Sequence, residues 1–181
     1  MHINIFGASG SGVTTLGKAL AEKLNYQYFD GDQYFWMPSH TPFTIRRPPE
    51  ERNALISHDT SQYKNWVLGG SVVNWNNNWN FDLSVFLYLP NEVRINRLKK
   101  REYERYGDII YTDKERNKQF NEFIEWASGY DENLNSGRTL QVHQNWMQSL
   151  HKPLLIIDGD TSVEERLEAV LLKIDELSNQ K

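Results

Sequence analysis

Short apolar runs alternate along this chain with longer amphipathic stretches. Runs at residues 2–6, 26–29, 66–68, 83–89 and 154–157 have the length and composition of buried strands. Hydrophobic positions recur at helical spacing after the first run, and further helices are expected over residues 49–63, 91–104, 114–127, 138–150 and 163–177. Strands that alternate with helices in this way predict an α/β fold, a three-layer structure around a five-stranded parallel sheet.

Prolines and capping residues give the predicted elements their boundaries. Pro49 stands in the first turn of a predicted helix, where proline is tolerated. Pro90 ends the fourth strand, and we expect Asn91 to cap the helix that follows. Thr161 and Glu164 have the spacing of a capping box at the start of the last helix.

Two long segments interrupt the alternation of strands and helices. Residues 31–65 separate the second and third strands, and residues 105–152 separate the fourth and fifth. We expect one domain over residues 1–181, because this length suits a single core. Both insertions would rise over the carboxyl edge of the sheet, where segments that close over a substrate are found.

Composition and net charge argue against several classes of binding partner and site. The net charge is −4, which argues against general binding to nucleic acid. The chain has no cysteine, which excludes disulfides and thiolate metal sites and suits a reducing compartment. No apolar run has the length of a membrane span, and the first residues lack the pattern of a secretory signal. We therefore expect a cytoplasmic monomer or homodimer without a membrane partner.

A glycine-rich loop follows the first strand and opens the first helix. The segment Gly7-Ala8-Ser9-Gly10-Ser11-Gly12-Val13-Thr14-Thr15 reads G-x-x-x-x-G-x-T, the pattern of a phosphate-binding loop. Glycines let backbone N–H groups turn inward, and the helix dipole favours an anion there. Thr14 can offer its hydroxyl to Mg²⁺, but Val13 stands where the motif has lysine. A glycine-rich turn without a ligand is the alternative.

The order of elements and two motifs resemble a known family. Besides the loop, the motif Leu89-Pro90-x-x-Val93-x-x-x-Arg97-Leu98-x-x-Arg101 resembles P-loop kinases of the nucleoside monophosphate kinase group, such as adenylate kinase. Shikimate and gluconate kinases are similar as well. The resemblance implies a P-loop fold with ATP and Mg²⁺ as cofactors, residues 31–65 as a substrate-binding insertion and residues 105–152 as a helical lid.

The resemblance also assigns roles to two acidic residues, and two arginines before the second predicted helix are further candidates for the acceptor site. Asp30 and Asp32 end the second strand and resemble the Asp-x-Asp of shikimate kinases, which implies that Asp30 helps to hold Mg²⁺ and that Asp32 binds the acceptor. A carboxylate there can accept the proton of a hydroxyl group. Arg46 and Arg47 are candidates for an anion of the acceptor, or they form a solvated pair.

Further residues carry over from the same families. Gly69 and Gly70 resemble a glycine pair that contacts substrate, although a plain turn explains them too. Arg97 and Arg101 resemble the arginines at the base of a lid, one on the adenine and one on phosphate, with a solvated helix face as the alternative. Arg138 stands where the family often has another phosphate-contacting arginine.

The sequence thus predicts a kinase that transfers the γ-phosphoryl group of Mg·ATP to a nucleoside monophosphate or small hydroxylated metabolite. We expect Asp32, Arg101 and Arg138 to be catalytic. The nucleotide would be bound by Gly7, Ser9, Gly10, Ser11, Gly12, Val13, Thr14, Thr15 and Arg97, Mg²⁺ by Thr14 and Asp30, and the acceptor by Asp30, Asp32, Arg46, Arg47, Gly69 and Gly70. The alternative is a nucleotide-binding sensor or scaffold without turnover, which Val13 favours.

Overall fold

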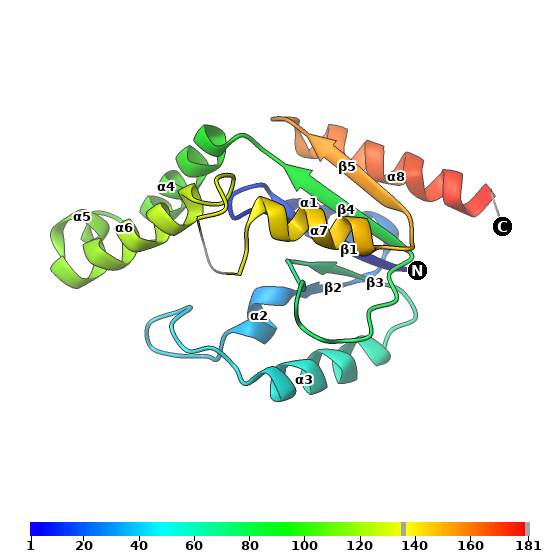
Figure 1. The fold of residues 1–181 in the computed structure, drawn as a ribbon, viewed down its shortest axis with the longest axis horizontal. Helices are drawn as coiled ribbons and strands as arrows, with labels where there is room; N and C mark the ends of the chain where they lie inside the picture. Colours follow the sequence, from blue (N-terminus) through cyan, green and yellow to red (C-terminus); the bar gives the residue numbers. More distant parts are fainter. Residues whose placement is uncertain (135–136, 180–181) are drawn as a thin grey trace.

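A five-stranded parallel sheet forms the centre of the molecule (Figure 1). The structure is a computed structural model that describes residues 1–134 and 137–179. The strands lie in the order β2-β3-β1-β4-β5. Their bounds are β1 (His2–Gly7), β2 (Gln27–Asp30), β3 (Trp66–Gly69), β4 (Leu83–Tyr88) and β5 (Leu154–Asp158). The predicted fold class is confirmed, because each strand pairs in parallel with its neighbours.

The helices agree with the predicted positions, with two additions. The helices are α1 (Val13–Leu24), α2 (Gly31–Phe35), α3 (Pro49–Ser61), α4 (Asn91–Tyr106), α5 (Ile109–Thr112), α6 (Lys114–Ser128), α7 (Leu140–Ser149) and α8 (Val163–Asn179). The short helices α2 and α5 were not predicted, since neither is long enough to show a periodic pattern. None of the helices in the described residues is long and apolar enough to cross a membrane.

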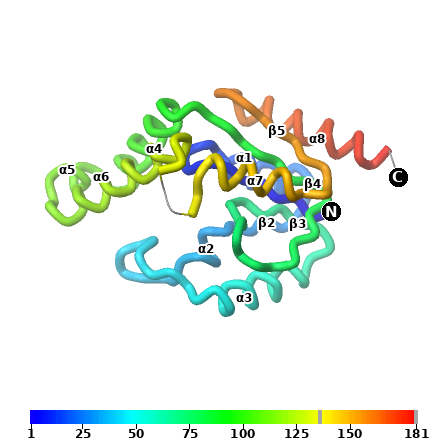
Figure 2. The backbone as a smooth tube through the Cα atoms, viewed as in Figure 1, coloured from blue at the N-terminus to red at the C-terminus, as the bar shows by residue number. Residues whose placement is uncertain are grey.

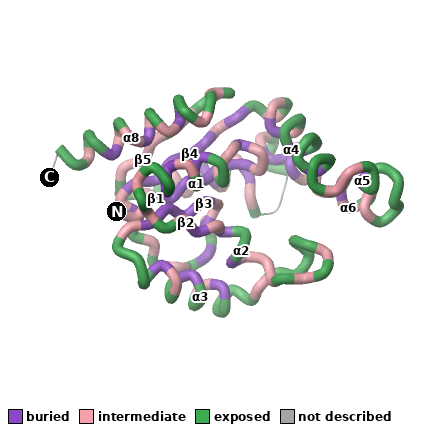
Figure 3. Tube along the Cα trace, turned by 180° about the vertical axis from the view of Figure 1, so that it is seen from behind, coloured by how far each residue is buried: buried purple, intermediate pink, exposed green. Residues whose placement is uncertain are grey.

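Each face of the sheet carries its own apolar layer. On one face, Leu16 and Leu20 of α1 pack with Val170 of α8 against the strands. On the other, Ile56 of α3 packs with aromatic residues of the sheet and its loops, and Trp146 of α7 packs against the same cluster. The inner strands β1, β3 and β4 are largely buried, whereas the edge strands β2 and β5 and the outer sides of α3 and α8 are more exposed (Figure 3). Burial of these layers is the main favourable contribution to folding.

The segment 105–152 divides into two parts with different positions. Helices α5 and α6 project from the body with the outer half of α4, at the end opposite the N-terminus and the end of α8 (Figure 2). Helix α7 instead lies on the sheet, where the rings of His143 and Trp146 meet Phe6 at centroid distances of 5.3 and 4.6 Å. We therefore restrict the proposed lid to α5, α6 and the outer part of α4.

A buried arginine joins this projection to the body. Arg94 of α4 is fully buried, and its guanidinium donates to the carbonyl oxygens of Leu89 (3.0 Å) and Ala127 (3.2 Å). It also forms an ion pair with Asp131, just after α6. Because one side chain binds the segment before α4 and the end of α6, the projection has a fixed base.

Two predicted helix caps are wrong in detail. The N-cap of α4 is Pro90, and the Asn91 side chain instead donates to the carbonyl oxygen of Ser128 (2.9 Å). At α8 the capping box is formed by Ser162 and Glu165, one residue after the predicted pair: Ser162 N–H donates to Glu165 Oε2, and Glu165 N–H donates to Ser162 Oγ. The Thr161 hydroxyl has a different partner, which belongs to the site described next.

Candidate nucleotide and acceptor site

The glycine-rich loop joins β1 to α1 at the carboxyl edge of the sheet. Gly10 and Gly12 have positive φ angles of 84° and 95°, a conformation that residues with a Cβ rarely adopt. Ser11 is buried, and both its N–H and its hydroxyl donate to the carbonyl oxygen of Ala8 (3.1 and 2.8 Å), so this side chain holds the turn. No side chain caps the N-terminus of α1, which leaves its first N–H groups available to an anion.

The first turn of α1 has no cationic side chain. Val13, in the position of the motif lysine, is partly buried and packs against the apolar layer between α1, α8 and the sheet. Thr14 and Thr15 are exposed. The first turn of α1 therefore offers a hydroxyl group for a metal ion, as predicted for Thr14, but no positive charge for the phosphates.

Two arginines of other helices bring positive charge to the end of the loop, beside the start of α1. Arg166 of α8 is 4% exposed, and its Nη1 donates to the carbonyl oxygen of Ser11 (2.7 Å). Arg97 of α4 forms an ion pair with Asp160. Its Nη1 would stand 4.0 Å from a Cβ on Gly12, so Arg97 lies beside the loop, and its contact with a nucleotide stays a prediction. Arg166 was not identified from the sequence, although a charged residue on the otherwise apolar stripe of α8 was a signal for it.

Arg101 is the one predicted catalytic residue that the structure does not bring to the loop. Its guanidinium forms an ion pair with Glu102 (3.1 Å) and lies 5.8 Å from the ring centre of Phe123 in α6. Glu102 is buried and is also 3.9 Å from Arg116 of α6. These contacts place Arg101 at the interface between α4 and the lid helix.

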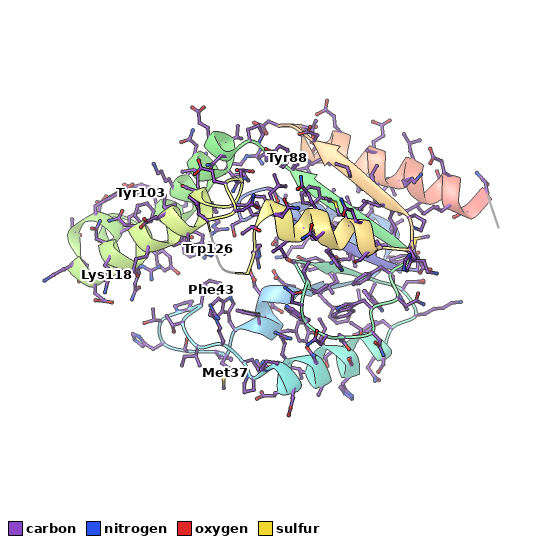
Figure 4. All side chains as sticks on the ribbon, in the orientation of Figure 1. Met37, Phe43, Tyr88, Tyr103, Lys118 and Trp126 are labelled. Carbon is purple, nitrogen blue, oxygen red and sulfur yellow. The ribbon has the colours of Figure 1, made fainter. Side chains whose placement is uncertain are left out.

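Arg138 connects the loop with the predicted acceptor residues. Its Nη1 lies 3.5 Å from the Ser9 hydroxyl of the loop, and its Nη2 lies 3.9 Å from Asp32 Oδ1. Its guanidinium is 5.9 Å from the ring centre of Trp126, at the inner end of α6. Figure 4 shows Trp126 at this inner end and Lys118 at the outer end of the projection. Groups from three distant parts of the chain therefore converge in one place.

The carboxylates of the acceptor site have different surroundings. Asp30 caps α2, since its Oδ1 accepts from the N–H of Asp32 (3.0 Å). Burial raises the pKa of the Asp30 carboxyl, while the bond from Asp32 N–H partly opposes this. Asp32 is about half exposed, with 54% of its side chain accessible, and extends toward Arg138.

The donor set at this edge fits Mg²⁺ bound together with phosphates. In the described part of the chain, no group of three or more histidine, aspartate or glutamate residues could hold a metal on its own. Asp30 has no ion-pair partner among those residues, and the Thr14 hydroxyl is exposed at the end of the loop. Mg²⁺ is commonly held by one or two protein oxygens with substrate phosphates and water, a requirement that Thr14 and Asp30 would meet.

The glycine pair at the end of β3 makes close contacts with the acceptor side. A Cβ on Gly70 would stand 3.4 Å from the Cα of Gly31, and a Cβ on Gly69 would collide with the hydroxyl of Tyr28. Gly69 is therefore required for packing against Tyr28, which is a structural reason for this residue. Gly70 and Gly31 let the ends of β3 and β2 approach each other beside Asp32.

The two arginines before α3 lie in different environments. Arg47 donates from Nε to the carbonyl oxygen of Tyr34 (3.0 Å) and from Nη1 to Glu51 (2.5 Å), so its donors are used within the fold. Arg46 is exposed, with its guanidinium 5.7 Å from the ring centre of Phe35. Of this pair, Arg46 is thus the one with donors directed to solvent. Nearby, Phe43 lies 5.8 Å from the guanidinium of Arg105, where the two insertions meet.

His143 of α7 is fully buried, and both of its ring nitrogens form hydrogen bonds. Its Nδ1 bonds with the Tyr130 hydroxyl (2.7 Å) and its Nε2 with the Ser71 hydroxyl (2.9 Å). These bonds connect the end of the lid with the loop after β3. Burial lowers the pKa of His143 to about 3, and the charge of Arg138 adds to the effect.

The low pKa of His143 makes stability depend on pH. Between pH 6.5 and about 3, the unfolded chain binds a proton at His143 and the folded chain does not, so stability falls as the pH decreases. We expect His143→Gln to remove this part of the loss. Denaturant unfolding of both proteins at several pH values measures it, and carboxylates that titrate in both cancel in the difference. Equal slopes would mean that His143 is not buried in its neutral form.

Comparisons with known proteins agree with this geometry. Residues 3–119 match the family model AAA_18, described as an AAA domain. The chain is 40% identical over 172 residues to the uncharacterized protein YqaC of Bacillus subtilis (strain 168), which covers 94% of this chain and 95% of that protein. It is 26% identical over 127 residues to a cytidylate kinase of Haloarcula marismortui, across 64% of this chain and 66% of that one.

A solved structure supports the same fold. The deoxyadenosine kinase from M. mycoides with bound dATP aligns with a TM-score of 0.60 at 14% identity, over 97% of this chain and 100% of that chain. The match to AAA_18 spans more than half of the chain, and relatives with a known activity are kinases. The chain therefore belongs to the AAA_18 family of P-loop proteins, in which its characterised relatives are kinases.

Proposed function

We propose that this protein is an ATP-dependent small-molecule kinase. It would transfer the γ-phosphoryl group of Mg·ATP to a hydroxyl or phosphate oxygen of a nucleoside monophosphate or a small hydroxylated metabolite. The position of Arg138 carries the proposal, because its guanidinium lies between Ser9 of the phosphate loop and Asp32 of the acceptor side. A phosphoryl group in transfer lies between the same two places.

The roles of the residues follow from this arrangement. The N–H groups of residues 10–15 would bind the phosphates, and Arg97 would contact the nucleotide beside Asp160. With a hydroxyl acceptor, Asp32 would accept the hydroxyl proton as the acceptor oxygen forms its bond to phosphorus and the bond to the leaving ADP oxygen breaks; an ionised phosphate acceptor has no proton to lose. Arg138 would neutralise the charge on the transferred group. Mg²⁺, held through Thr14 and Asp30, would supply further charge neutralisation.

A sensor or scaffold without turnover is the second candidate, and one observation favours it. Val13 packs against the apolar layer, so α1 sends no cation to the phosphates. Such a protein would still bind a nucleotide through the loop N–H groups. The kinase remains the better proposal, because a sensor needs no carboxylate beside the arginine that contacts the phosphate loop.

Acceptor-dependent formation of ADP tests the proposal. The protein is incubated with Mg·ATP and, separately, with nucleosides, nucleoside monophosphates and small hydroxylated metabolites. We expect one of these classes to raise the rate of ADP formation well above the rate without acceptor. Asp32→Asn serves as the matched control, because it should remove that increase. A rate that no acceptor changes, together with tight ATP binding, would favour the sensor.

A further inference from the structure

The structure holds one arginine rigidly behind the phosphate loop. Arg166 stands in the first turn of α8 and donates from three nitrogens: Nη1 to the carbonyl oxygen of Ser11 (2.7 Å), Nε to the Thr161 hydroxyl (2.9 Å) and Nη2 to the carbonyl oxygen of Gly159 (3.2 Å). With 4% of its surface exposed, this guanidinium has a fixed position and orientation. A fixed charge needs no reorganisation when a ligand arrives.

The approach of Arg166 to the loop depends on Gly12. A Cβ at this residue would stand 2.8 Å from Arg166 Nη1, and the φ angle of 95° also disfavours any residue with a side chain. Nη1 of Arg97 would be 4.0 Å from the same Cβ position. Two guanidinium groups therefore flank the last residue of the loop, next to the N–H groups that begin α1.

The charged side chains around Gly12 carry more positive than negative charge. Asp160 forms its ion pair with Arg97. Within residues 1–134 and 137–179, no carboxylate lies within ion-pair distance of Arg166. Burial, and then the charge of Arg97, lower the pKa of Arg166, while the charge of Asp160 partly opposes this; an arginine stays protonated in proteins, and one carboxylate then faces two guanidinium groups. A buried cation whose hydrogen bonds go only to neutral oxygens leaves a net positive charge at the loop.

We propose that Arg166 supplies the permanent positive charge of the phosphate site that Val13 does not provide. The charge acts from behind the loop, through Gly12, and draws the phosphates of a nucleotide toward the N–H groups at the start of α1. It is a positioning residue with an electrostatic effect, because its donors stay on the loop and on the turn before α8. This inference rests on the proposed binding of ATP.

The main alternative is a purely structural role. The hydrogen bonds of Arg166 connect the turn after β5 to the phosphate loop. In a purely structural role, any side chain that keeps this connection would preserve nucleotide binding. Two substitutions separate the roles. Arg166→Lys keeps the charge and loses the three-way set of hydrogen bonds, whereas Arg166→Gln keeps some hydrogen bonding and loses the charge. If the role of Arg166 is only structural, both variants should lose the same affinity for nucleotides. If its charge matters, only Arg166→Gln should lose affinity.

Binding of Mg·ATP and of ADP, measured by titration calorimetry, tests the proposal. We expect Arg166→Gln to weaken both nucleotides by about 10-fold or more, and Arg166→Lys by no more than about 3-fold, since the charge acts on phosphates that both nucleotides share. Adding Val13→Lys to Arg166→Gln should restore most of the affinity. Lys173→Gln is the control, because it removes a positive charge from α8 at a residue whose partner is Glu176.

The outcomes distinguish this inference from the function on which it rests. Equal losses in the two Arg166 variants, or no loss with glutamine, would overturn the inference and leave the kinase proposal intact. A wild-type protein that binds neither nucleotide would overturn both. If Arg166→Gln does not fold, Val13→Lys in the otherwise unchanged protein decides. A gain below about 3-fold agrees with a charge already in place, and a gain above about 10-fold contradicts it.

Discussion

Replacing Arg138 by glutamine should lower the turnover by roughly 10³-fold, the range of a transition-state arginine in phosphoryl transfer. The guanidinium lies within 3.5 Å of Ser9 Oγ and 3.9 Å of Asp32 Oδ1, so it faces both the phosphates and the acceptor. The charge that develops on the transferred group is absent from bound ATP. The dissociation constant for ATP should therefore change much less than the turnover.

Steady-state kinetics and calorimetry on the same protein measure the two effects of Arg138→Gln. Arg105→Gln is a matched control, because Arg105 also contacts an aromatic ring, that of Phe43, but within the described residues it pairs with Glu102 and not with the loop or Asp32. A large loss from both variants would mean that removal of charge from this region acts generally. If Arg138→Gln weakened ATP binding as much as turnover, Arg138 would serve binding alone.

Replacing Asp32 by asparagine should lower the turnover by roughly 10²- to 10³-fold, within the range of a general base. The amide has nearly the same shape, but it cannot accept the proton of an acceptor hydroxyl. Asp32 is half exposed, its carboxylate contacts Arg138, and its backbone bonds to Asp30 and Trp36 do not involve the side chain, so the change leaves the structure in place. ATP binding should persist.

The same assay applied to Asp30→Asn separates the two carboxylates. Asp30 holds the start of α2 and would bind Mg²⁺, so its variant should raise the concentration of Mg²⁺ needed for half-maximal rate. Asp32→Asn should leave that concentration unchanged. Equal and small effects of both substitutions on rate and on Mg²⁺ dependence would reduce Asp30 and Asp32 to residues of an ordinary turn.

The sheet could be predicted from the sequence because buried strands carry a local signal. The run at residues 83–89 is almost wholly apolar, and the structure has it as the inner strand β4 (Leu83–Tyr88), between β1 and β5. The phosphate loop could be predicted for the same reason, since a strand, spaced glycines and a helix start are all local features. Boundaries shifted by a residue or two where caps decide them, as at Ser162.

Buried arginines explain much of what the sequence did not predict. In three helices an arginine stands on the buried face at helical spacing from other buried residues: Arg52 with Ile56, Arg94 with Leu98, and Arg166 with Val170. A sequence pattern assigns arginine to the solvated face by default. Their partners are carbonyl oxygens of segments distant in the chain, such as Ser11 for Arg166, and these become known only with the fold.

The sequence also did not predict which of the candidate arginines meet at the site. Arg97 and Arg101 share a spacing of one turn, yet Arg97 pairs with Asp160 beside the loop and Arg101 pairs with Glu102 at the lid. The difference arises because α4 extends away from the body of the molecule, so that successive turns of this helix have different neighbours. Arg138 was predicted as a phosphate contact, and its second neighbour, Asp32, follows from the folded arrangement of α2 and α7.

The fate of the γ-phosphoryl group tests the central claim most directly. The protein is incubated with ATP labelled in the γ-position, Mg²⁺ and the acceptor class that raises ADP formation, and the label is then located. A kinase predicts the label on the acceptor in the wild-type protein, and its loss from that product in Asp32→Asn. Label that appears only as inorganic phosphate, or that stays in ATP although the nucleotide binds, would contradict the account.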